Sequence, residues 1–376
     1  MEIGSILKLM VQRKGSDLFI TAGKPPSLKL SGVIKAISKH VLSEHETREI
    51  VYSIMSDKIR KEFDRTKEAN FAINPEKLGR FRVSAFIQRD QIGMVIRRIE
   101  TNIPHFKELG LPSKLREFAM LKRGLVIIVG ATGSGKSSTL AAMVGHRNRH
   151  STSHIISIED PIEFMHEHEQ SIVTQREVGV DTESYEVALK NTLRQAPDVI
   201  LIGEIRTRET MEHAITFAET GHLVLSTLHS SSAYQTMDRI INFFPRERHN
   251  QLLLDLSLNL RAIVAQQLLP RSDGKGRVPA VEILINSPLV QDMIRKGEIH
   301  KLKDIMKRST EEGMITFDQS LFILHQAGKI SYEDALTHAE SSNEIRLLIK
   351  LDKGDSQLGA RLQDELPSQM LLDDDD

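Results

Sequence analysis

The sequence predicts an α/β fold in which a smaller α+β domain precedes a larger domain built on a mostly parallel sheet. Three observations indicate this arrangement. In the first hundred or so residues, strand patterns are grouped with strands and helix patterns with helices, as in an α+β domain with an antiparallel sheet. Beyond residue 112, buried-type apolar strands alternate with helices, as in a parallel sheet covered on both faces. Between the first of these strands and its helix lies a glycine-rich turn, residues 130–137.

The first domain is expected over residues 1–99. Ile3, Ile6, Leu7, Met10 and Val11 recur at the spacing of one face of an amphipathic helix. Two short apolar segments on either side of Ser31-Gly32 are typical of a hairpin. The remaining elements are expected as strands at 17–20, 27–30, 33–37, 69–73, 80–87 and 93–99, with helices at 44–55 and 57–65.

Residues 100–112 contain two prolines, one glycine and no clean periodicity, which predicts an interdomain linker. The second domain is expected over 113–351, with strands at 125–129, 154–158, 199–202, 223–226 and 281–285. Helices are expected after Ser287, at 289–296, 301–308, 316–327, 332–339 and 342–351. From Leu351 onward the chain carries eight acidic and two basic residues, so 352–376 is predicted to be an acidic disordered tail.

Composition excludes several classes of function. The chain has no cysteine, which removes disulfides, thiolate metal sites and cysteine nucleophiles. Its 50 basic and 51 acidic residues leave a net charge of −1, and this balance gives no electrostatic case for a nucleic-acid partner. Neither a membrane-spanning apolar run nor the pattern of a signal peptide occurs in it. A cytoplasmic protein is therefore expected.

The glycine-rich turn matches the pattern G-x-x-x-x-G-K-[ST] at every fixed position. An apolar strand precedes it and a helix-like stretch follows, so backbone N–H groups and the helix N-terminus would surround phosphate groups. Lys136 would reach the terminal phosphates, and the Ser137 hydroxyl would hold Mg²⁺. The sequence thus predicts that ATP or a similar nucleoside triphosphate is bound by Gly130, Ala131, Thr132, Gly133, Ser134, Gly135, Lys136, Ser137 and Ser138.

Carboxylates follow two further strands. Glu159, Asp160 and Glu163 come just after the second strand, where open α/β sheets bind ligands. Glu163 is the predicted catalytic carboxylate, because Glu159 and Asp160 lie nearer the strand end and could serve structure or Mg²⁺. The alternative is that such residues cap helices or contribute only solubility. The next strand ends at Glu204, as a Walker B strand does, and this carboxylate is predicted to bind Mg²⁺ through water.

Histidines and arginines complete the set of candidates. His222 and His229 frame the fourth strand, and either a satisfied structural role or a sensor of the γ-phosphate is consistent with them. Charge on a transferred phosphoryl group calls for a guanidinium. The candidates for it are Arg80, Arg82, Arg97, Arg98, Arg194, Arg206 and Arg208, and the residue pattern alone does not select among them.

These motifs, in this order, resemble the secretion-superfamily ATPases of the type IV pilus and type II secretion kind. The acidic box 159–163, the Gly203-Glu204 pair and the His box 221–229 follow the Walker A loop as in that family. Three more segments resemble the retraction branch, PilT and its paralogue PilU: 15–18, 80–83 and 175–179. The resemblance extends from the N-terminal helix to about Leu324.

The resemblance implies a PAS-like N-terminal domain, a RecA-like ATPase domain and a homo-hexamer whose ATP sites are completed by a neighbouring subunit. It assigns catalytic roles to Glu163, Glu204 and His229, and matches Arg82 and Arg97 to arginines that the family contributes from the N-terminal domain. It also implies an inner-membrane pilus platform protein as partner, ATP hydrolysis coupled to pilus retraction in twitching motility, and a cytoplasmic location peripheral to the inner membrane.

Two departures from the family refine this expectation. The region 267–278 is short and lacks the tetracysteine element of assembly-type relatives, which favours retraction. The C-terminal motif of PilT is degraded at 289–296, which favours an accessory motor of the PilU kind, acting beside a PilT-type ATPase. Two alternatives remain open: an ATP-binding regulatory subunit that does not need its own turnover, and a RecA-like DNA motor, which the charge balance and acidic tail disfavour.

Overall fold

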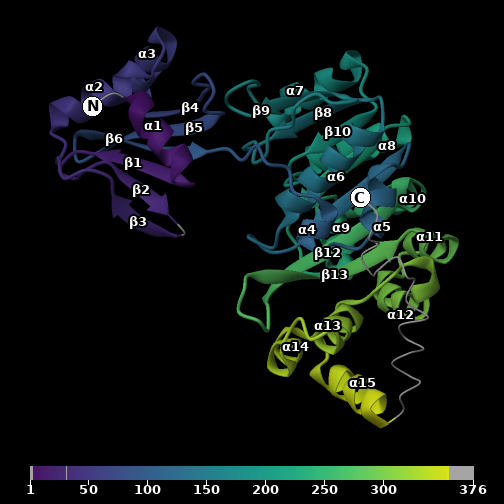
Figure 1. The fold of residues 1–376 in the computed structure, drawn as a ribbon. Coiled ribbons are helices and arrows are strands. Elements are labelled where there is room, and N and C mark those ends of the chain that lie inside the picture. Colours follow the sequence, from purple (N-terminus) through teal and green to yellow (C-terminus); the bar gives the residue numbers. More distant parts are fainter. Residues whose placement is uncertain (1–2, 31, 355–376) are drawn as a thin grey trace. The chain divides into compact units, whose positions relative to one another are not determined.

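The computed structural model describes residues 3–30 and 32–354, which form two compact units (Figure 1). Unit 1 comprises the chain through Asn102 together with the segments Ile162–Met165 and Glu177–Glu183. Unit 2 comprises Ile103–Pro161, His166–Arg176 and the described chain from Ser184 to Gly354. The two short segments of unit 1 come from the region between the second and third predicted strands of the larger domain. No local sequence pattern predicts that they pack with the first unit.

Unit 1 is built on a six-stranded antiparallel sheet of order β3-β2-β1-β6-β5-β4. The pairs β1–β2, β2–β3, β1–β6, β5–β6 and β4–β5 are all antiparallel. The elements are α1 (Ile3–Gln12), β1 (Asp17–Thr21), β2 (Ser27–Leu30), β3 (Val33–Ala36), α2 (Glu44–Ser53), α3 (Asp57–Thr66), β4 (Glu68–Ile73), β5 (Phe81–Gln88) and β6 (Gln91–Arg98).

Side-chain alternation explains how this sheet makes a core on one face. Leu18 and Ile20 of β1 and Ile96 and Met94 of β6 are buried, and they pair across the strands as Leu18 with Ile96 and Ile20 with Met94. Helices α1, α2 and α3 add buried side chains to the same cluster, among them Phe63. The residues between these positions on each strand point to the other face of the sheet.

Unit 2 is built on a seven-stranded sheet of order β13-β12-β7-β11-β10-β8-β9. The strands β12, β7, β11, β10 and β8 pair in parallel, whereas β13 runs antiparallel to β12. The strands are β7 (Gly124–Val129), β8 (His154–Glu159), β9 (Ile172–Glu177), β10 (Val199–Ile202), β11 (Leu223–Leu228), β12 (Leu260–Pro270) and β13 (Arg277–Ile285).

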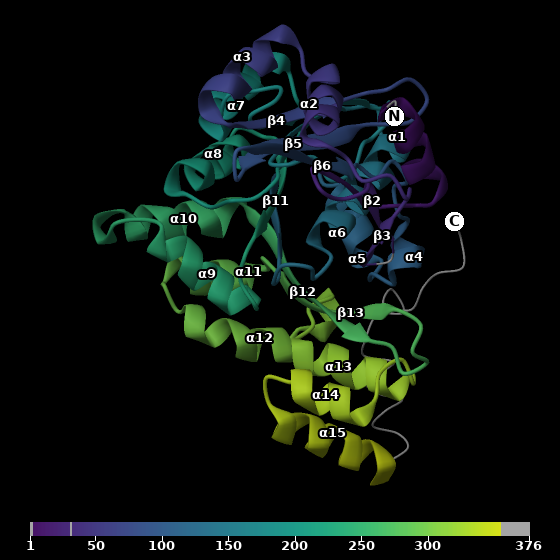
Figure 2. The ribbon, with the colours of Figure 1, turned by 90° about the vertical axis from the view of Figure 1, so that its left-hand side faces the viewer.

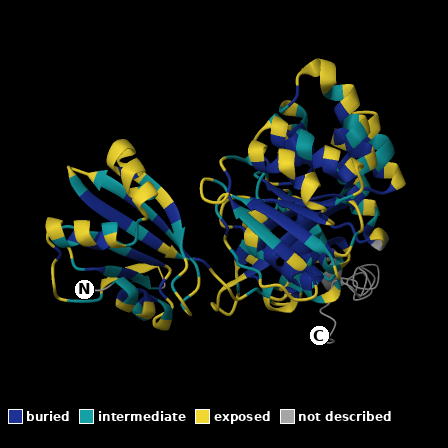
Figure 3. Cartoon of the chain, turned by 90° about the horizontal axis from the view of Figure 1, so that it is seen from above, coloured by how far each residue is buried: buried dark blue, intermediate teal, exposed yellow. Residues whose placement is uncertain are grey.

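The helices of unit 2 pack on this sheet or on one another. They are α4 (Phe106–Leu109), α5 (Lys114–Ala119), α6 (Lys136–His150), α7 (Tyr185–Thr192), α8 (Arg208–Glu219), α9 (Ala233–Asn242), α10 (His249–Asn259), α11 (Pro288–Arg295), α12 (Leu302–Arg308), α13 (Phe317–Gln326), α14 (Tyr332–His338) and α15 (Ser342–Gly354). Every residue of β7, β10 and β11 is buried, as strands covered on both faces must be, and these strands are dark blue in Figure 3.

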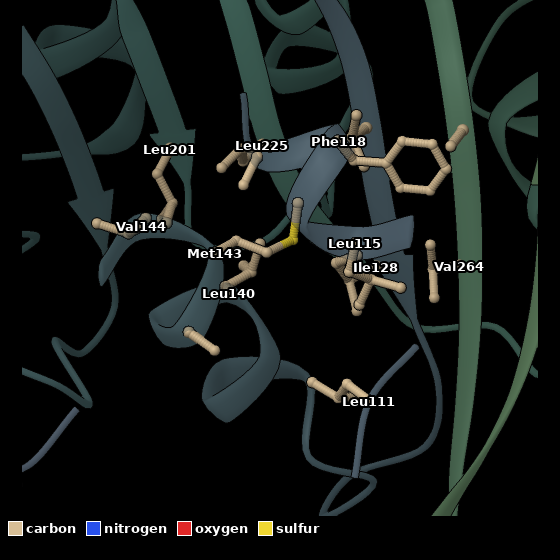
Figure 4. Packing of buried hydrophobic residues seen from close by; sticks show 14 of the residues in the cluster. Leu111, Leu115, Phe118, Ile128, Leu140, Met143, Val144, Leu201, Leu225 and Val264 are labelled. Carbon is tan, nitrogen blue, oxygen red and sulfur yellow. The ribbon is translucent and has the colours of Figure 1, made fainter. Parts of the chain in front are cut away.

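The core next to the glycine-rich turn is apolar and close-packed (Figure 4). Met143 on α6 lies among Leu115 and Phe118 of α5 and side chains of the sheet, including Ile128 of β7. Burying apolar side chains of this size stabilises a fold by roughly 1.5–3 kcal/mol each. The helix that follows the turn is therefore fixed against the sheet by its packing, and the turn is fixed with it.

The last three helices lie side by side at the C-terminal end of the described chain (Figure 2). Asp318 of α13 accepts hydrogen bonds from the backbone N–H groups of Glu340 and Ser341, which lead into α15. Ser320 Oγ of the same helix accepts one from Val281 N of β13, at 3.1 Å. These bonds connect the helices to one another and to the edge of the sheet.

The predicted fold class is confirmed: a smaller α+β unit with an antiparallel sheet is followed by a larger α/β unit with a mostly parallel sheet. The stretch 100–112, predicted as an interdomain linker, contains the short helix α4. Other local predictions were incomplete. Strands β9 and β12 were missed, and of the region 267–278 only residues 271–276 connect strands. The missed β12 follows α10 without an intervening turn residue, so no break in the sequence pattern marks its start.

The predicted acidic tail, 352–376, lies almost wholly outside the described residues. Within 3–30 and 32–354, no helix combines the length and apolar character that crossing a bilayer requires.

Candidate nucleotide site

Four parallel strands of unit 2 end at one edge of the sheet, and each is followed by candidate residues. The neighbours β7, β11, β10 and β8 are in register, so that Val129 pairs with Leu228 and Ile202 pairs with both Ser226 and Ile158. The glycine-rich turn, His229, Glu204 and the Glu159-Asp160 pair therefore follow adjacent strand ends. This is the edge at which open α/β sheets bind ligands.

The turn has the backbone geometry of a phosphate-binding loop. Gly133 and Gly135 adopt φ angles of 79° and 92°, which side chains strongly disfavour, and α6 begins directly afterwards at Lys136. The Lys136 Nζ donates to the carbonyl oxygens of Gly130 and Ala131, each at 2.9 Å. Burial lowers the pKa of this ammonium group because it destabilises the charged form. An anionic ligand next to the ammonium group would stabilise that charge.

Glu204 and His229 are in contact. Nε2 of His229 lies 3.0 Å from an Oε of Glu204, and the Glu204 side chain is mostly buried. Arg206 forms an ion pair with the same carboxylate. Burial lowers the pKa of His229, and the nearby charges of Lys136 and of arginines lower it further. The neutral form of the imidazole is thus favoured at this position.

Backbone and hydroxyl contacts hold this pair in place. Ile205 N donates to Thr227 O at 2.8 Å, and Thr227 Oγ1 donates to Gly203 O at 2.7 Å. The residues on either side of Glu204 are therefore bound to the end of β11, two positions before His229. These bonds join the loop after β10 to the end of β11. The backbone positions of Glu204 and His229 are therefore fixed relative to each other, which keeps their side chains in contact.

Glu159 and Asp160 also lie at this edge, but Glu159 has structural partners. Its Oε1 accepts hydrogen bonds from Ser157 Oγ at 2.7 Å and from Gln175 Nε2 at 3.2 Å. The Tyr185 hydroxyl is buried close by, where burial and the charges of Asp160 and Glu159 raise its pKa. These contacts support the reading of Glu159 as a structural acidic residue.

His222 lies at the opposite end of β11 from His229 and is a structural residue. Its Nδ1 is 3.1 Å from both Phe217 O and Thr220 Oγ1, and its backbone N–H donates to Phe217 O. It therefore satisfies groups at the C-terminal end of α8. Of the two histidines that frame the strand, only His229 is at the ligand-binding edge.

Glu163, Arg82 and Arg97 all belong to unit 1. Glu163 lies in the segment 162–165, and its charge raises the pKa of Arg97, although the hydrogen bond to Asp17 is the largest cause of that shift. Arg82 and Arg97 are directly opposite each other on β5 and β6, and Arg97 is opposite Asp17 on β1. Lys29 on β2 is in turn opposite Asp17. Arg82, Arg97, Asp17 and Lys29 therefore form a row of charged residues across four strands, here called the charged row.

A second group of acidic residues in unit 1 was missed at the sequence level. Glu177 has a fully buried side chain 3.9 Å from Arg82 Nε, and its pKa is raised by burial. Asp181 accepts from Glu177 N at 2.9 Å and from Arg80 at 3.3 Å. The segment 175–179 carries the resemblance to the retraction branch. Its alternating charges, and the two arginines of 80–82, were the only local signals of a charged cluster. Neither signal shows that the two segments are in contact.

The residues at the sheet edge fit a nucleotide with its metal ion. Ser134 Oγ is buried within the turn without a hydrogen-bond partner, as expected of a group that an anion would satisfy. Within the described chain, no three His, Asp or Glu side chains converge as ligands. A Mg²⁺ ion would therefore be held by few protein groups, and Ser137 and Glu204 are suited to it in number and chemistry, since Mg²⁺ retains several waters and phosphate oxygens.

Comparison with known proteins places this arrangement in a family. The family described as "Type II/IV secretion system protein" matches residues 5–321. The chain belongs to that family. It is an ATPase, as its relatives are, and the resemblance drawn from its motifs is confirmed.

The chain is 62% identical over 351 residues to the type IV pilus ATPase PilU of Pseudomonas aeruginosa, covering 93% of this chain and 92% of that protein. It is 39% identical to the PilT of the same organism, described as a type IV pilus retraction ATPase, over 90% of this chain and 98% of PilT. Among solved structures, that of the pilus retraction motor PilT with bound ADP matches with a TM-score of 0.86 at 39% identity, over 92% and 99% of the two chains. The Legionella pneumophila ATPase DotB matches with a TM-score of 0.77 at 26% identity, over 89% and 93%.

Proposed function

We propose that this ATPase powers type IV pilus retraction in twitching motility as an accessory motor, working beside a PilT-type ATPase. It would act as a homo-hexamer in the cytoplasm, at the inner membrane, on the platform protein of the pilus. The observation that carries the proposal is the 62% identity to PilU over nearly the whole chain, together with a Walker A lysine, Glu204 and His229 at one sheet edge.

Each site residue has a proposed part in hydrolysis. Residues 130–138 bind the phosphates of ATP, and Ser137 and Glu204 hold Mg²⁺, which would neutralise phosphate charge. Glu163 orients and deprotonates the attacking water. His229 responds to the γ-phosphate through its contact with Glu204. Arg82 and Arg97 stabilise the charge that develops on the transferred group.

Phosphate release by the purified protein tests the assignment of Glu163. Glu163→Gln removes the base and keeps the side-chain shape, so turnover should fall at least 100-fold while ADP binding stays within about threefold. Glu167→Gln, an exposed neighbour, serves as the matched control and should hydrolyse ATP like the parent. A Glu163→Gln variant as active as the parent would refute this role.

A mixing experiment tests the proposed hexamer and the contribution of Arg97. Lys136→Ala and Arg97→Ala are each expected to be inactive alone. If arginines act on the nucleotide of a neighbouring subunit, a mixture assembled in one ring contains sites with an intact lysine and an intact arginine, and it recovers part of the ATPase activity. If every site is made by one chain, the mixture stays inactive, and the shared site is wrong.

Pilus retraction in cells separates the motor from a regulatory subunit. A Lys136→Ala substitution in this chain removes turnover but not the protein. Loss of the retraction that depends on this chain supports the motor, and full retraction supports an ATP-binding subunit that does not need its own turnover. A deletion strain sets the lower limit, and a strain with the exposed Lys122 changed to alanine sets the upper one.

A further inference from the structure

A buried polar residue lies directly beside the phosphate-binding loop and was not among the predicted site residues. Gln266 is on β12, the strand that pairs with β7 on the side away from β11. Ala265 is in register with Val129, the last residue of β7, so Gln266 is next to Gly130, the first residue of the loop. Only 3% of Gln266 is exposed. A buried side-chain amide is expected to be hydrogen-bonded, because burying it without hydrogen bonds is unfavourable.

Gln266 contacts the loop at both ends, and it does so where only glycine fits. A Cβ atom on Gly130 would lie 2.4 Å from Ser134 Oγ and 2.5 Å from the backbone carbonyl oxygen of Gln266. A Cβ atom on Gly135 would lie 2.7 Å from the Gln266 amide nitrogen, Nε2. Gly130 therefore packs against the backbone of Gln266, and Gly135 packs against the side-chain amide of the same residue, so a side chain at position 135 would displace that amide.

The third contact extends to the helix after the loop. Thr139 Oγ1 donates a buried hydrogen bond of 2.7 Å to Gln266 Oε1. Thr139 is itself fully buried on α6, one turn after the lysine of the motif. The amide of Gln266 therefore joins the middle of β12 to the first turn of α6, which supplies the N–H groups and partial positive charge that phosphates require.

We propose that Gln266 is a positioning residue for ATP hydrolysis, whose side-chain amide sets the shape of the phosphate-binding loop through its contacts with Gly135 and Thr139. A loop held in its binding shape loses less freedom when a nucleotide arrives, so the loss of this support weakens nucleotide affinity. The effect is on the phosphate-binding step. The inference rests on the ATPase activity alone and is independent of any role in the pilus.

Gln266→Met tests this, because methionine keeps the length and approximate volume of the side chain and removes the amide. The KM for ATP and the Kd for ADP, the latter from calorimetric titration, are each expected to rise about tenfold. The kcat at saturating ATP should stay within about threefold. The control is Gln267→Met, since Gln267 is the next residue on the same strand, is only half-buried and points to the other face. It should leave both constants within twofold.

Thr139→Val supplies a second variant that does not touch β12. It removes the hydroxyl donor and should raise the Kd for ADP by a similar factor, and the double variant should be no worse than Gln266→Met alone. Melting followed by circular dichroism reports folding separately. A Gln266→Met protein that melts at a lower temperature but keeps the parental KM has lost only a structural contact, and the proposal is overturned. Additive effects of the two substitutions overturn the link through Thr139.

Discussion

The two units of this chain place their charged residues in different ways. In unit 1 the charged row Lys29, Asp17, Arg97 and Arg82 lies on four neighbouring strands themselves, near one end of the sheet. In unit 2 the strands β7, β10 and β11 are wholly buried, and the polar groups of the candidate site follow the strand ends. The first sheet is antiparallel with its core cluster on one face, whereas the second is mostly parallel with helices over both.

The difference follows from which parts of a sheet remain available for polar groups. A sheet with one face packed leaves every second residue of each strand free to be polar, so a charged row can occupy any level of the strands. A sheet packed on both faces leaves few strand positions for polar residues, and those present, such as Gln266 on β12, are hydrogen-bonded. Most of the candidate site residues of unit 2 therefore lie in the loops, where backbone N–H groups and the N-termini of helices are available.

The largest expected change in unfolding free energy comes from a substitution that tests whether the cores of the two units are independent. Phe63 is the one buried side chain of α3 and belongs to the cluster of unit 1, which shares no residue with the cluster around Met143 in unit 2. Phe63→Ala should lower the unfolding free energy of unit 1 by about 3–5 kcal/mol. ADP affinity should be unchanged.

Urea denaturation followed by circular dichroism measures the first quantity and calorimetric titration the second. Val33→Ala, at an exposed position of unit 1, is the control and should change stability by no more than about 0.5 kcal/mol. If Phe63→Ala abolished ADP binding, the two cores would not be independent and the comparison of the units would fail.

A middle-sized effect concerns the buried carboxylate of unit 2. Glu282 on β13 is 3% exposed, accepts a hydrogen bond from Ala233 N at 2.6 Å, and has a pKa raised to about 7 by burial, with Lys303 and Glu340 nearby. With Ser232, Tyr234, Gln235 and Met306, these three residues line a hollow of about 250 Å³. The folded protein therefore binds a proton at Glu282 that the unfolded chain releases near pH 4.5.

The direction in which stability changes with pH follows from this difference in pKa between the folded and unfolded states. The contribution of protonated Glu282 to stability is complete below pH 4.5 and is lost as the pH rises towards 7, by up to about 3 kcal/mol. Glu282→Gln cannot titrate and should remove this fall in unfolding free energy between pH 4.5 and 7. Glu219→Gln, at an exposed position on α8, should keep the parental profile. Identical profiles for the parent and Glu282→Gln would contradict the prediction.

The smallest effect concerns the charged row of unit 1. Arg97 Nε lies 2.8 Å from Asp17, whose side chain is nearly buried while that of Arg97 is mostly exposed. Burial raises the pKa of Asp17, but hydrogen bonds from Arg97 and Ser16 and nearby positive charges outweigh it, so the pKa is lowered. The pair therefore contributes to stability above pH 3.8 and loses this contribution as the pH falls further.

Solvent around Arg97 screens the interaction, so Asp17→Asn should cost only about 1 kcal/mol at neutral pH. A double-mutant cycle with Arg97→Gln, read by urea denaturation, isolates the pair. Lys29→Gln, at the end of the charged row, should change stability less. A coupling free energy of zero at neutral pH would show that the contact between Asp17 and Arg97 has no energetic role.

Much of the fold and part of the candidate site could be predicted from local patterns. The amphipathic spacing of Ile3 to Val11 defined α1, and the apolar runs before Gly130, Glu204 and His229 defined β7, β10 and β11. The phosphate-binding loop was evident because its function requires particular residues at a fixed spacing within eight positions. Each of these patterns is complete within a short segment, because hydrogen bonds of helices and the alternation of strands act over a few residues.

Tertiary structure alone decided the rest. It brought Glu204 within 3.0 Å of His229, put Glu163 and Glu177 with the arginines of unit 1, and set Gln266 beside a loop more than a hundred residues earlier in the chain. These relations depend on the order of strands in a sheet and on which segments pack together. The free energy of such packing is summed over the whole core, so no short stretch of sequence contains it.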